Sequence, residues 1–203
     1  VFKSDDYGNS WEVISEDLSK QIDRNTLKVY DRVISIDAVE KNGSTSPYGT
    51  IVALSESSID PDFIAIGTDD GLIQITEDGG KTWRKVDNIS GAPEQSYVNS
   101  VYLSQHDSNL IYAAFNHHKY GDFTPYVFKS EDRGNSWKSI SNNLPKRGSV
   151  YSIEEDHVDK SLVFCGTEFG VFFSPNKGER WKKLGNGLPT IAVRDIAIQR
   201  REN

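Results

Sequence analysis

Ser130-Glu131-Asp132-Arg133-Gly134-Asn135-Ser136-Trp137 is a stretch of eight residues that occurs, with variation, four times in the chain. The other copies span residues 4–11, 76–83 and 174–181. All share Ser or Thr at the first position, Asp or Asn at the third, Gly at the fifth and Trp at the eighth. Together they contain all 4 tryptophans of the protein. The chain is therefore built on an internal repeat.

Each copy is predicted to be the turn of a β-hairpin, because apolar runs flank it. Gly supplies the positive φ that such a turn needs. The Asp or Asn side chain can accept hydrogen bonds from N–H groups of the turn. Trp starts the return strand. The residues predicted to build these turns are Ser4, Asp6, Gly8, Trp11, Thr76, Asp78, Gly80, Trp83, Ser130, Asp132, Gly134, Trp137, Ser174, Asn176, Gly178 and Trp181.

This repeat resembles the Asp-box, or bacterial neuraminidase repeat (BNR), with three complete copies and a degenerate fourth. The resemblance covers the whole chain. Families that carry the box include sialidases, xyloglucanase-type glycosidases, sortilin-type receptors and a photosystem assembly factor. In them the box closes the hairpin between the third and fourth strands of a propeller blade, distant from the active site. The resemblance implies an all-β fold, a partial β-propeller of four-stranded antiparallel blades, in which the boxes are structural.

The spacing of the repeat predicts how the chain is divided. The shared glycines lie 72, 54 and 44 residues apart, whereas a four-stranded blade takes about 40–45 residues. We expect residues 1–18 to end one blade and residues 19–49 to be an insertion. Residues 50–90, 91–144 and 145–189 are expected to form blades, the second with a strand at 110–114. Residues 190–203 are expected to supply the first strand of a further blade, at 193–198. The chain is thus expected to be a fragment of one larger propeller domain, with the rest of that propeller as a partner.

Composition excludes several partners. The formal net charge is −7 and the pI about 5.1, which argues against nucleic acid, since phosphate binding needs a basic stripe. No apolar run approaches the roughly 20 residues that cross a bilayer. Cys165 is the only cysteine, so no internal disulfide is expected. No metal or cofactor is expected either, because the adjacent His117 and His118 would point opposite ways in an extended segment.

Candidate site residues lie at the end of the blades opposite the boxes. In a four-stranded meander, the loops between strands two and three and the connections between blades share that end. Both long insertions, residues 19–49 and the loop predicted at 115–125, fall there. Loops carry function more often than scaffolds do, so the ligand-binding candidates are His117, His118, Tyr120, Asp122 and Phe123. Asp70 and Glu168 are the weak catalytic candidates, because a glycosidase needs two carboxylates about 5–10 Å apart. Asp70 reads equally well as part of a turn.

A further resemblance bears on function. Residues 49–57, 67–73, 125–130 and 189–198 are similar to large secreted bacterial proteins described as BNR-repeat glycosyl hydrolases or sortilin-like proteins. This implies a secreted, periplasmic or cell-surface location. No sialidase arginine triad is present, and no xyloglucanase catalytic aspartate is matched. We therefore expect a module that binds protein, peptide or glycan through the face opposite the boxes. The alternatives are part of a xyloglucanase- or sialidase-like glycoside hydrolase acting on polysaccharide, and a structural spacer without a pocket.

Overall fold

The computed structural model describes residues 1–29, 31–43, 48–185 and 187–201, and most of its regular structure is β-strand. Three sheets of four antiparallel strands dominate it. The first contains β5 (Ile51–Glu56), β6 (Ile64–Thr68), β7 (Ile73–Thr76) and β8 (Arg84–Val86). The second contains β9 (Tyr97–Leu103), β10 (Ile111–His117), β11 (Asp122–Ser130) and β12 (Lys138–Ser139). The third contains β13 (Val150–Glu155), β14 (Val163–Thr167), β15 (Gly170–Ser174) and β16 (Lys182–Lys183).

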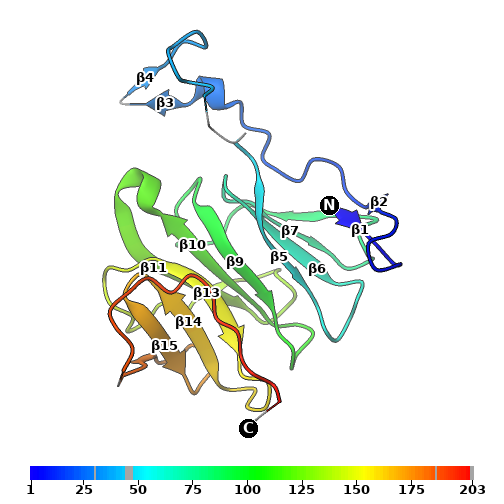
Figure 1. The fold of residues 1–203 in the computed structure, drawn as a ribbon, viewed down its shortest axis with the longest axis vertical. Coiled ribbons are helices and arrows are strands. Elements are labelled where there is room, and N and C mark those ends of the chain that lie inside the picture. The colour runs from blue at the N-terminus through cyan, green and yellow to red at the C-terminus, as the bar shows by residue number, and fades with distance from the viewer. Residues whose placement is uncertain (30, 44–47, 186, 202–203) are drawn as a thin grey trace.

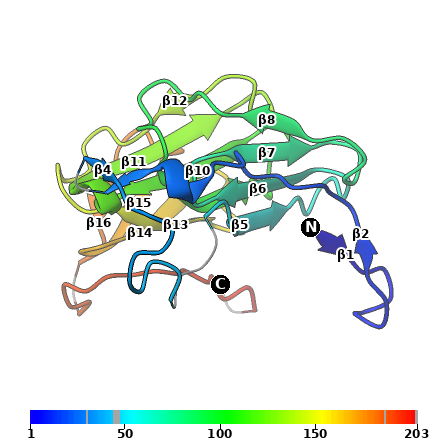
Figure 2. The same cartoon turned by 90° about the horizontal axis from the view of Figure 1, so that it is seen from above.

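Every sheet is a simple meander in which strands that follow one another in the chain also pair. The first strands of neighbouring sheets contact each other, β5 with β9 and β9 with β13, and they lie toward the viewer in Figure 1. The short last strands β8 and β12 lie at the opposite rim (Figure 2). The predicted all-β architecture of four-stranded antiparallel sheets is confirmed.

The middle sheet has a buried core on both of its faces. Along β10, Ile111, Ala113 and Phe115 pack in the cluster shared with the first sheet. Their neighbours Tyr112 and Ala114 pack in the cluster shared with the third sheet. A strand that is covered on both faces reads as a continuous apolar run rather than an alternating one. This explains why the predicted strand at 110–114 carries no polar residue.

Four short strands and a 3-10 turn precede the sheets. β1 (Phe2–Lys3) pairs with β2 (Glu12–Val13), and β3 (Lys28–Val29) pairs with β4 (Arg32–Val33) after the 3-10 turn η1 (Arg24–Thr26). The β3–β4 hairpin stands away from the three sheets in Figure 1. β4 ends at Val33, so the apolar stretch that runs on to Ile36 does not extend this strand. Residues 44–47 of this insertion lie outside the described part of the chain.

Two predicted elements differ from the structure. Residues 115–125 are predicted as a long loop, but β10 continues to His117 and β11 begins at Asp122, and these two residues are paired across the strands. Only the 3-10 turn η2 (His118–Tyr120) and Gly121 separate the strands. Residues 193–198 are predicted as a strand, yet no strand is present in the described part of that segment. Its Val193 N–H donates to the Thr167 carbonyl at 2.9 Å, but no neighbouring strand pairs along it.

The four repeated turns link β1 to β2, β7 to β8, β11 to β12, and β15 to β16, and they share one hydrogen-bond pattern. In the third turn the Ser130 hydroxyl accepts from Gly134 N at 2.7 Å and donates to Asp132 Oδ1 at 2.8 Å. Asp132 then accepts from the Ser136 N–H and hydroxyl at 2.8 and 2.5 Å. The fourth turn keeps the backbone bond, from Arg180 N to Asn176 at 3.0 Å, but its Arg side chain provides no hydroxyl.

The shared glycine of the turn also touches the preceding sheet. A Cβ placed on Gly80 would lie 2.8 Å from Ile14 Cβ, and one on Gly178 would lie 2.5 Å from Ile140 Cδ1. Gly134 likewise faces Ile75 of the first sheet. Two of the tryptophans bond across the same junction, from Trp83 Nε1 to the Ile14 carbonyl at 3.0 Å and from Trp181 Nε1 to the Ile140 carbonyl at 2.7 Å. All four turns therefore close their own hairpins, and the second, third and fourth also fasten the hairpin to the sheet before it.

We expect Gly178→Ala to destabilise the protein by about 2–5 kcal/mol. The residue has φ +85°, which costs an L-residue about 1–2 kcal/mol, and the new methyl group would overlap Ile140, which adds about 1–3 kcal/mol. Gly121→Ala is the matched control, since it has φ +74° and nothing within 4 Å. Urea denaturation measures both. Equal losses in the two variants would show that contact with the preceding sheet does not require glycine.

The Asp132 carboxylate of the third turn should make the stability of the fold depend on pH in the acidic range. Hydrogen bonds from the Ser136 side chain and N–H, then from Ser130, lower the pKa of Asp132 from 3.8 to about 2. A lowered pKa stabilises the fold above the unfolded value, and this contribution disappears as pH falls from about 4 through 2. Asp132→Asn should therefore be less stable than the parent at pH 7, with a difference that shrinks toward pH 2.

Asn176→Asp in the fourth turn is the converse variant and should gain acid sensitivity over the same range. Urea midpoints measured at intervals between pH 2 and 7 test both changes. A constant difference between Asp132→Asn and the parent over this whole range would contradict the assignment of the low pKa to the turn.

Candidate functional site

The end of the sheets opposite the repeated turns gathers the candidate side chains; we call it the loop end. It comprises the β6–β7, β10–β11 and β14–β15 turns and the segments that lead into β5, β9 and β13. Each sheet is an antiparallel meander, so these segments must lie together, and the repeated turns must lie at the other end. A cavity of about 370 Å³ opens at the loop end beside Gly71, Pro93, Glu94 and Phe115.

A lysine lies between two tyrosine rings at the loop end. The ammonium group of Lys119 is 5.9 Å from the centre of the Tyr48 ring and 5.6 Å from that of Tyr97. Burial, and then the nearby Tyr120, Asp70 and Asp69, raise the pKa of Tyr48 to about 12. Burial and Asp69 also raise the pKa of Tyr97. Both phenols therefore stay neutral at physiological pH, and Lys119 is held by their ring faces rather than by a phenolate.

Three of the predicted ligand-binding residues are brought together. The His117 and Tyr120 rings stack with centroids 4.3 Å apart, and the Tyr120 hydroxyl donates to Gln95 Oε1 at 2.8 Å. Burial lowers the pKa of His117, although Asp122 opposes this. Asp122 is half-buried, which favours its neutral form, but hydrogen bonds from Tyr126 and Thr124 outweigh that effect and lower its pKa. The ring of His117 is thus largely neutral at pH 7.

The other two predicted ligand-binding residues, His118 and Phe123, have partners outside this stack. His118 is exposed and its Nδ1 lies 2.6 Å from Asn116 Oδ1. Phe123 is half-buried, and the guanidinium carbon of Arg147 lies 4.6 Å from the centre of its ring. His117 and His118 therefore do not converge on a shared point. Among the residues that the structure describes, no three His, Cys, Asp or Glu side chains are grouped as a metal site would need.

The first catalytic candidate, Asp70, is fully buried and both of its oxygens are engaged. Its Oδ2 accepts from Lys20 N at 2.8 Å, and its Oδ1 accepts a short hydrogen bond from the Thr68 hydroxyl. The adjacent Asp69 accepts from the N–H groups of Gly49 and Thr50, at 2.8 Å each. These bonds tie the segments around residues 20 and 49 to the β6–β7 turn, which is what the turn interpretation of this pair anticipates.

The second catalytic candidate, Glu168, is half-buried in the β14–β15 turn. Its Oε2 is buried and has no hydrogen-bond partner in the described structure. The hydroxyl of Ser149, whose carbonyl accepts from Glu168 N at 3.0 Å, is also buried without a partner. Asp70 belongs to the first sheet and Glu168 to the third, so the middle sheet separates their elements.

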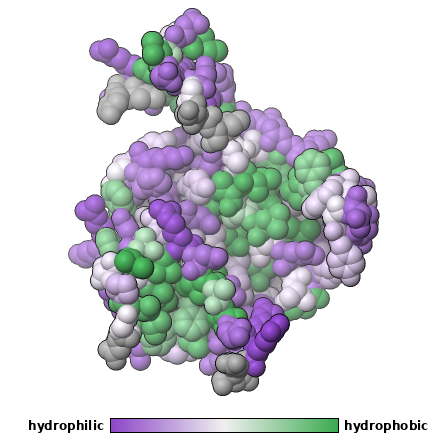
Figure 3. Space-filling view, in the orientation of Figure 1, coloured by the Kyte–Doolittle hydropathy of each residue, from purple (hydrophilic) through white to green (hydrophobic). Residues whose placement is uncertain are grey.

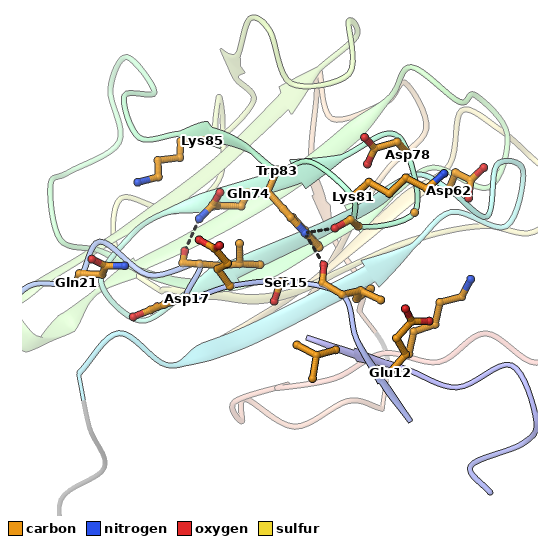
Figure 4. A pocket seen from close by; sticks show the side chains of 17 residues that line it. Glu12, Ser15, Asp17, Gln21, Asp62, Gln74, Asp78, Lys81, Trp83 and Lys85 are labelled. Carbon is orange, nitrogen blue, oxygen red and sulfur yellow. Dashed lines mark hydrogen bonds between the residues drawn. The ribbon is translucent and has the colours of Figure 1, made fainter. Parts of the chain in front are cut away.

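A larger cavity, of about 940 Å³, lies between residues 12–18 and the first sheet (Figure 4). Two of the polar side chains that line it already form hydrogen bonds with the backbone of residues 12–18. Gln74 Nε2 donates to the Leu18 carbonyl at 2.7 Å, and Trp83 Nε1 donates to the Ile14 carbonyl. Asp78 on its wall is occupied by its own turn. The cavity borders the face of the first sheet that the second sheet does not cover, so we interpret it as space between sheets.

Three residues of the loop end were not identified from sequence. Tyr48 precedes β5, Arg147 precedes β13, and Arg194 lies with its guanidinium carbon 4.7 Å from the centre of the Tyr151 ring. The available signal was an aromatic residue near the start of a first strand, at Tyr48, Tyr97 and Tyr151. A cation that reaches each of these rings from another segment leaves no pattern along the sequence.

No protein-family model matches the chain, and no curated protein matches it. Solved structures do resemble it. An ancestral GH74 enzyme is 22% identical with a TM-score of 0.55, over 69% of this chain and 19% of that one. YCF48 bound to D1 peptide is 20% identical with a TM-score of 0.52, over 66% and 40%. The GH74 xyloglucanase from Xanthomonas campestris is 13% identical with a TM-score of 0.53, over 69% and 24%.

These likenesses, with the sheet topology, define the class: the chain has a partial β-propeller fold of four-stranded antiparallel blades. It spans between about a fifth and two fifths of the structures that it resembles. Identities this low establish the fold alone. No helix in the described part of the chain is long and apolar enough to cross a membrane.

Asp70→Ala should destabilise the protein, because it leaves the Lys20 N–H without its acceptor and the Thr68 hydroxyl with only the Leu72 carbonyl to donate to. A buried donor that loses its partner costs about 1–3 kcal/mol. Asp195→Ala is a control at an exposed carboxylate and should change stability little. Urea denaturation of both variants measures the difference. An Asp70→Ala protein of parental stability would show that the carboxylate is not retained for these bonds.

Proposed function

We propose that the chain is a recognition module of a propeller protein and binds a protein, peptide or glycan at its loop end. The observation that supports this most is the contrast between the two kinds of charged group there. Asp69, Asp70 and Asp122 are engaged with the protein's own hydrogen-bond donors. Lys119 and Arg147 are exposed and have only aromatic rings beside them among the described residues. Exposed aromatic and cationic side chains are typical of recognition surfaces.

As part of this proposal, we assign the chain to the Asp-box (BNR) group, which includes sortilin-like proteins, and the repeated turns support this assignment. The hydrogen bonds of the four turns explain why Ser or Thr, Asp or Asn, and Gly recur at fixed positions. We further propose that the chain works within a larger propeller that is secreted or exposed at a cell surface. Apolar surface over β5 and over β14 and β15 (Figure 3) is what further blades would cover. Leu54 is 56% exposed there.

A second candidate function is glycoside hydrolysis, and one observation favours it. The unpartnered, buried oxygen of Glu168 is a feature that a general acid can have, and two of the similar structures are GH74 enzymes. Asp70 is the weaker member of this pair, since both of its oxygens are engaged. A hydrolase would need a second carboxylate facing Glu168 across a sugar ring.

Replacing Tyr120 and Phe123 with Ala together should weaken ligand binding by more than about 1 kcal/mol, because aromatic side chains dominate binding energy at recognition surfaces. The ligand is found by screening immobilised peptides and glycans, and affinities are then measured by titration. Tyr7→Ala is the control, because Tyr7 is a fully exposed aromatic side chain in the first repeated turn. Ligands that bind the parent and the Tyr120/Phe123 variant equally would place recognition elsewhere.

A polysaccharide and sialoside hydrolysis assay distinguishes the second candidate. If the chain or its parent propeller hydrolyses a glycan, Glu168→Gln should remove turnover while leaving the affinity for that glycan nearly unchanged. No hydrolysis of any substrate in the screen would reject the enzyme and leave recognition standing.

A further inference from the structure

Three cations of the loop end each lie on an aromatic ring. Lys119 lies on Tyr97 and Tyr48, Arg147 on Phe123, and Arg194 on Tyr151, with separations from 4.6 to 5.9 Å. All three cations are exposed. Within the described part of the chain none of them has a hydrogen-bond or ion-pair partner. We call Lys119, Arg147 and Arg194 the cation row.

Backbone contacts at the loop end join the segments of the second and third blades that carry the row. The Phe123 carbonyl accepts from Gly148 N at 2.8 Å, so the β10–β11 hairpin that carries Lys119 is bonded to the segment that carries Arg147. Gly148 is also close to the ring of Phe169, where a Cβ would lie 3.0 Å away. Arg194 reaches the start of β13, two residues beyond Ser149. The three cations therefore lie on segments that meet at the loop end.

Acidic side chains at this end do not neutralise the row. The buried Asp69 and Asp70 face the backbone, and Asp122 is held by Thr124 and Tyr126. Asp195 and Glu94 are exposed and Glu168 is half-buried, but none of these three forms an ion pair with a cation of the row among the described residues. Although the chain has a net charge of −7, these three cations make the loop end locally positive. A surface of this kind attracts an anionic partner.

The placement of the rings indicates which anion fits. Neutral sugars bind by stacking on open aromatic faces, but here the cations occupy a face of Tyr97, Phe123 and Tyr151. A uronic acid polysaccharide gains less from stacking its sugar rings on these three side chains, because a cation already covers one face of each. Carboxylates on flexible side chains need only the N–H donors, which Arg and Lys still have available. Exposed Tyr120 and Phe169, at 59% and 36%, add apolar contact area of the kind that polypeptides use.

We propose that the cation row binds a carboxylate-rich polypeptide segment, with Lys119, Arg147 and Arg194 pairing with its Asp or Glu side chains. This specifies the ligand for the recognition surface proposed above and rests on that proposal. The aromatic rings act by holding the three cations outward, which lowers the entropy lost when a carboxylate binds.

The test uses a fluorescent oligoglutamate peptide as the probe and fluorescence anisotropy as the measurement. Substitution of one cation by Gln should weaken binding about threefold to tenfold, and Lys119→Gln/Arg147→Gln/Arg194→Gln together more than about thirtyfold. The control is Lys81→Gln/Lys138→Gln/Lys160→Gln, three exposed lysines at the other end of the blades, which removes the same net charge and should leave affinity within about twofold. Raising salt from about 50 to 500 mM should weaken binding of the parent. Melting temperatures confirm folding, and Arg194→Gln serves alone if the triple variant does not fold.

Three results would overturn the proposal. Equal losses in the row and control variants would show a general charge effect. Polygalacturonate that binds more tightly than the peptide, and needs the row, would assign the surface to a polysaccharide. No binding of the peptide at low salt would reject an acidic polypeptide. In each case the separate screen with the Tyr120 and Phe123 variant shows whether recognition at the loop end still stands.

Discussion

The structure depends on how the repeated turns are fixed internally and how the second, third and fourth are fixed to the sheet before them. Within the turn, one carboxylate or amide oxygen set accepts from groups four residues ahead, as Asp132 does from Ser136. Across the junction, a glycine allows an isoleucine of the preceding sheet to approach, as Gly178 does for Ile140. The first interaction sets where the hairpin reverses, and the second sets how one sheet lies on the next. A propeller needs both interactions. Strand pairing acts only within a sheet, so contacts between sheets must set the orientation of one sheet relative to the next.

This arrangement divides each blade into two ends with different constraints. At the end with the repeated turns, the side-chain oxygens accept hydrogen bonds from N–H groups of the same turn. Few of these groups are therefore available to bind a ligand. At the loop end the segments differ from blade to blade in length and composition. The β10–β11 hairpin extends beyond its equivalents, to His117 and Asp122, and carries Lys119 to the rings of Tyr48 and Tyr97. The same fold therefore provides a uniform end for assembly and a variable end for recognition.

Charge at the loop end is also sorted by role. Asp69 and Asp70 stabilise the scaffold by joining distant segments to the β6–β7 turn, and their burial removes them from contact with a ligand. The three cations of the row, by contrast, lie on ring faces, and their N–H groups make no hydrogen bond within the described part of the chain. A buried carboxylate also joins distant segments in the interior. Glu155 accepts hydrogen bonds from the Ser104 hydroxyl and Gln105 N, and so joins the second and third sheets. Burial raises the pKa of that carboxyl group, in spite of these two bonds.

The sequence by itself determined the repeat, the strand order and the end at which loops collect. Gly, Asp or Asn, and Trp at fixed positions have local causes, a positive φ and an oxygen within reach of nearby N–H groups, so eight residues suffice to predict each turn. Burial of Asp70 could not be predicted, because its partner Lys20 lies 50 residues away in the chain. The end of β10 was misplaced because cross-strand pairing of His117 with Asp122 extends the hairpin, whatever the polarity of the residues. The cation row was decided by tertiary structure alone, since each cation and its ring come from segments that meet only when the blades pack.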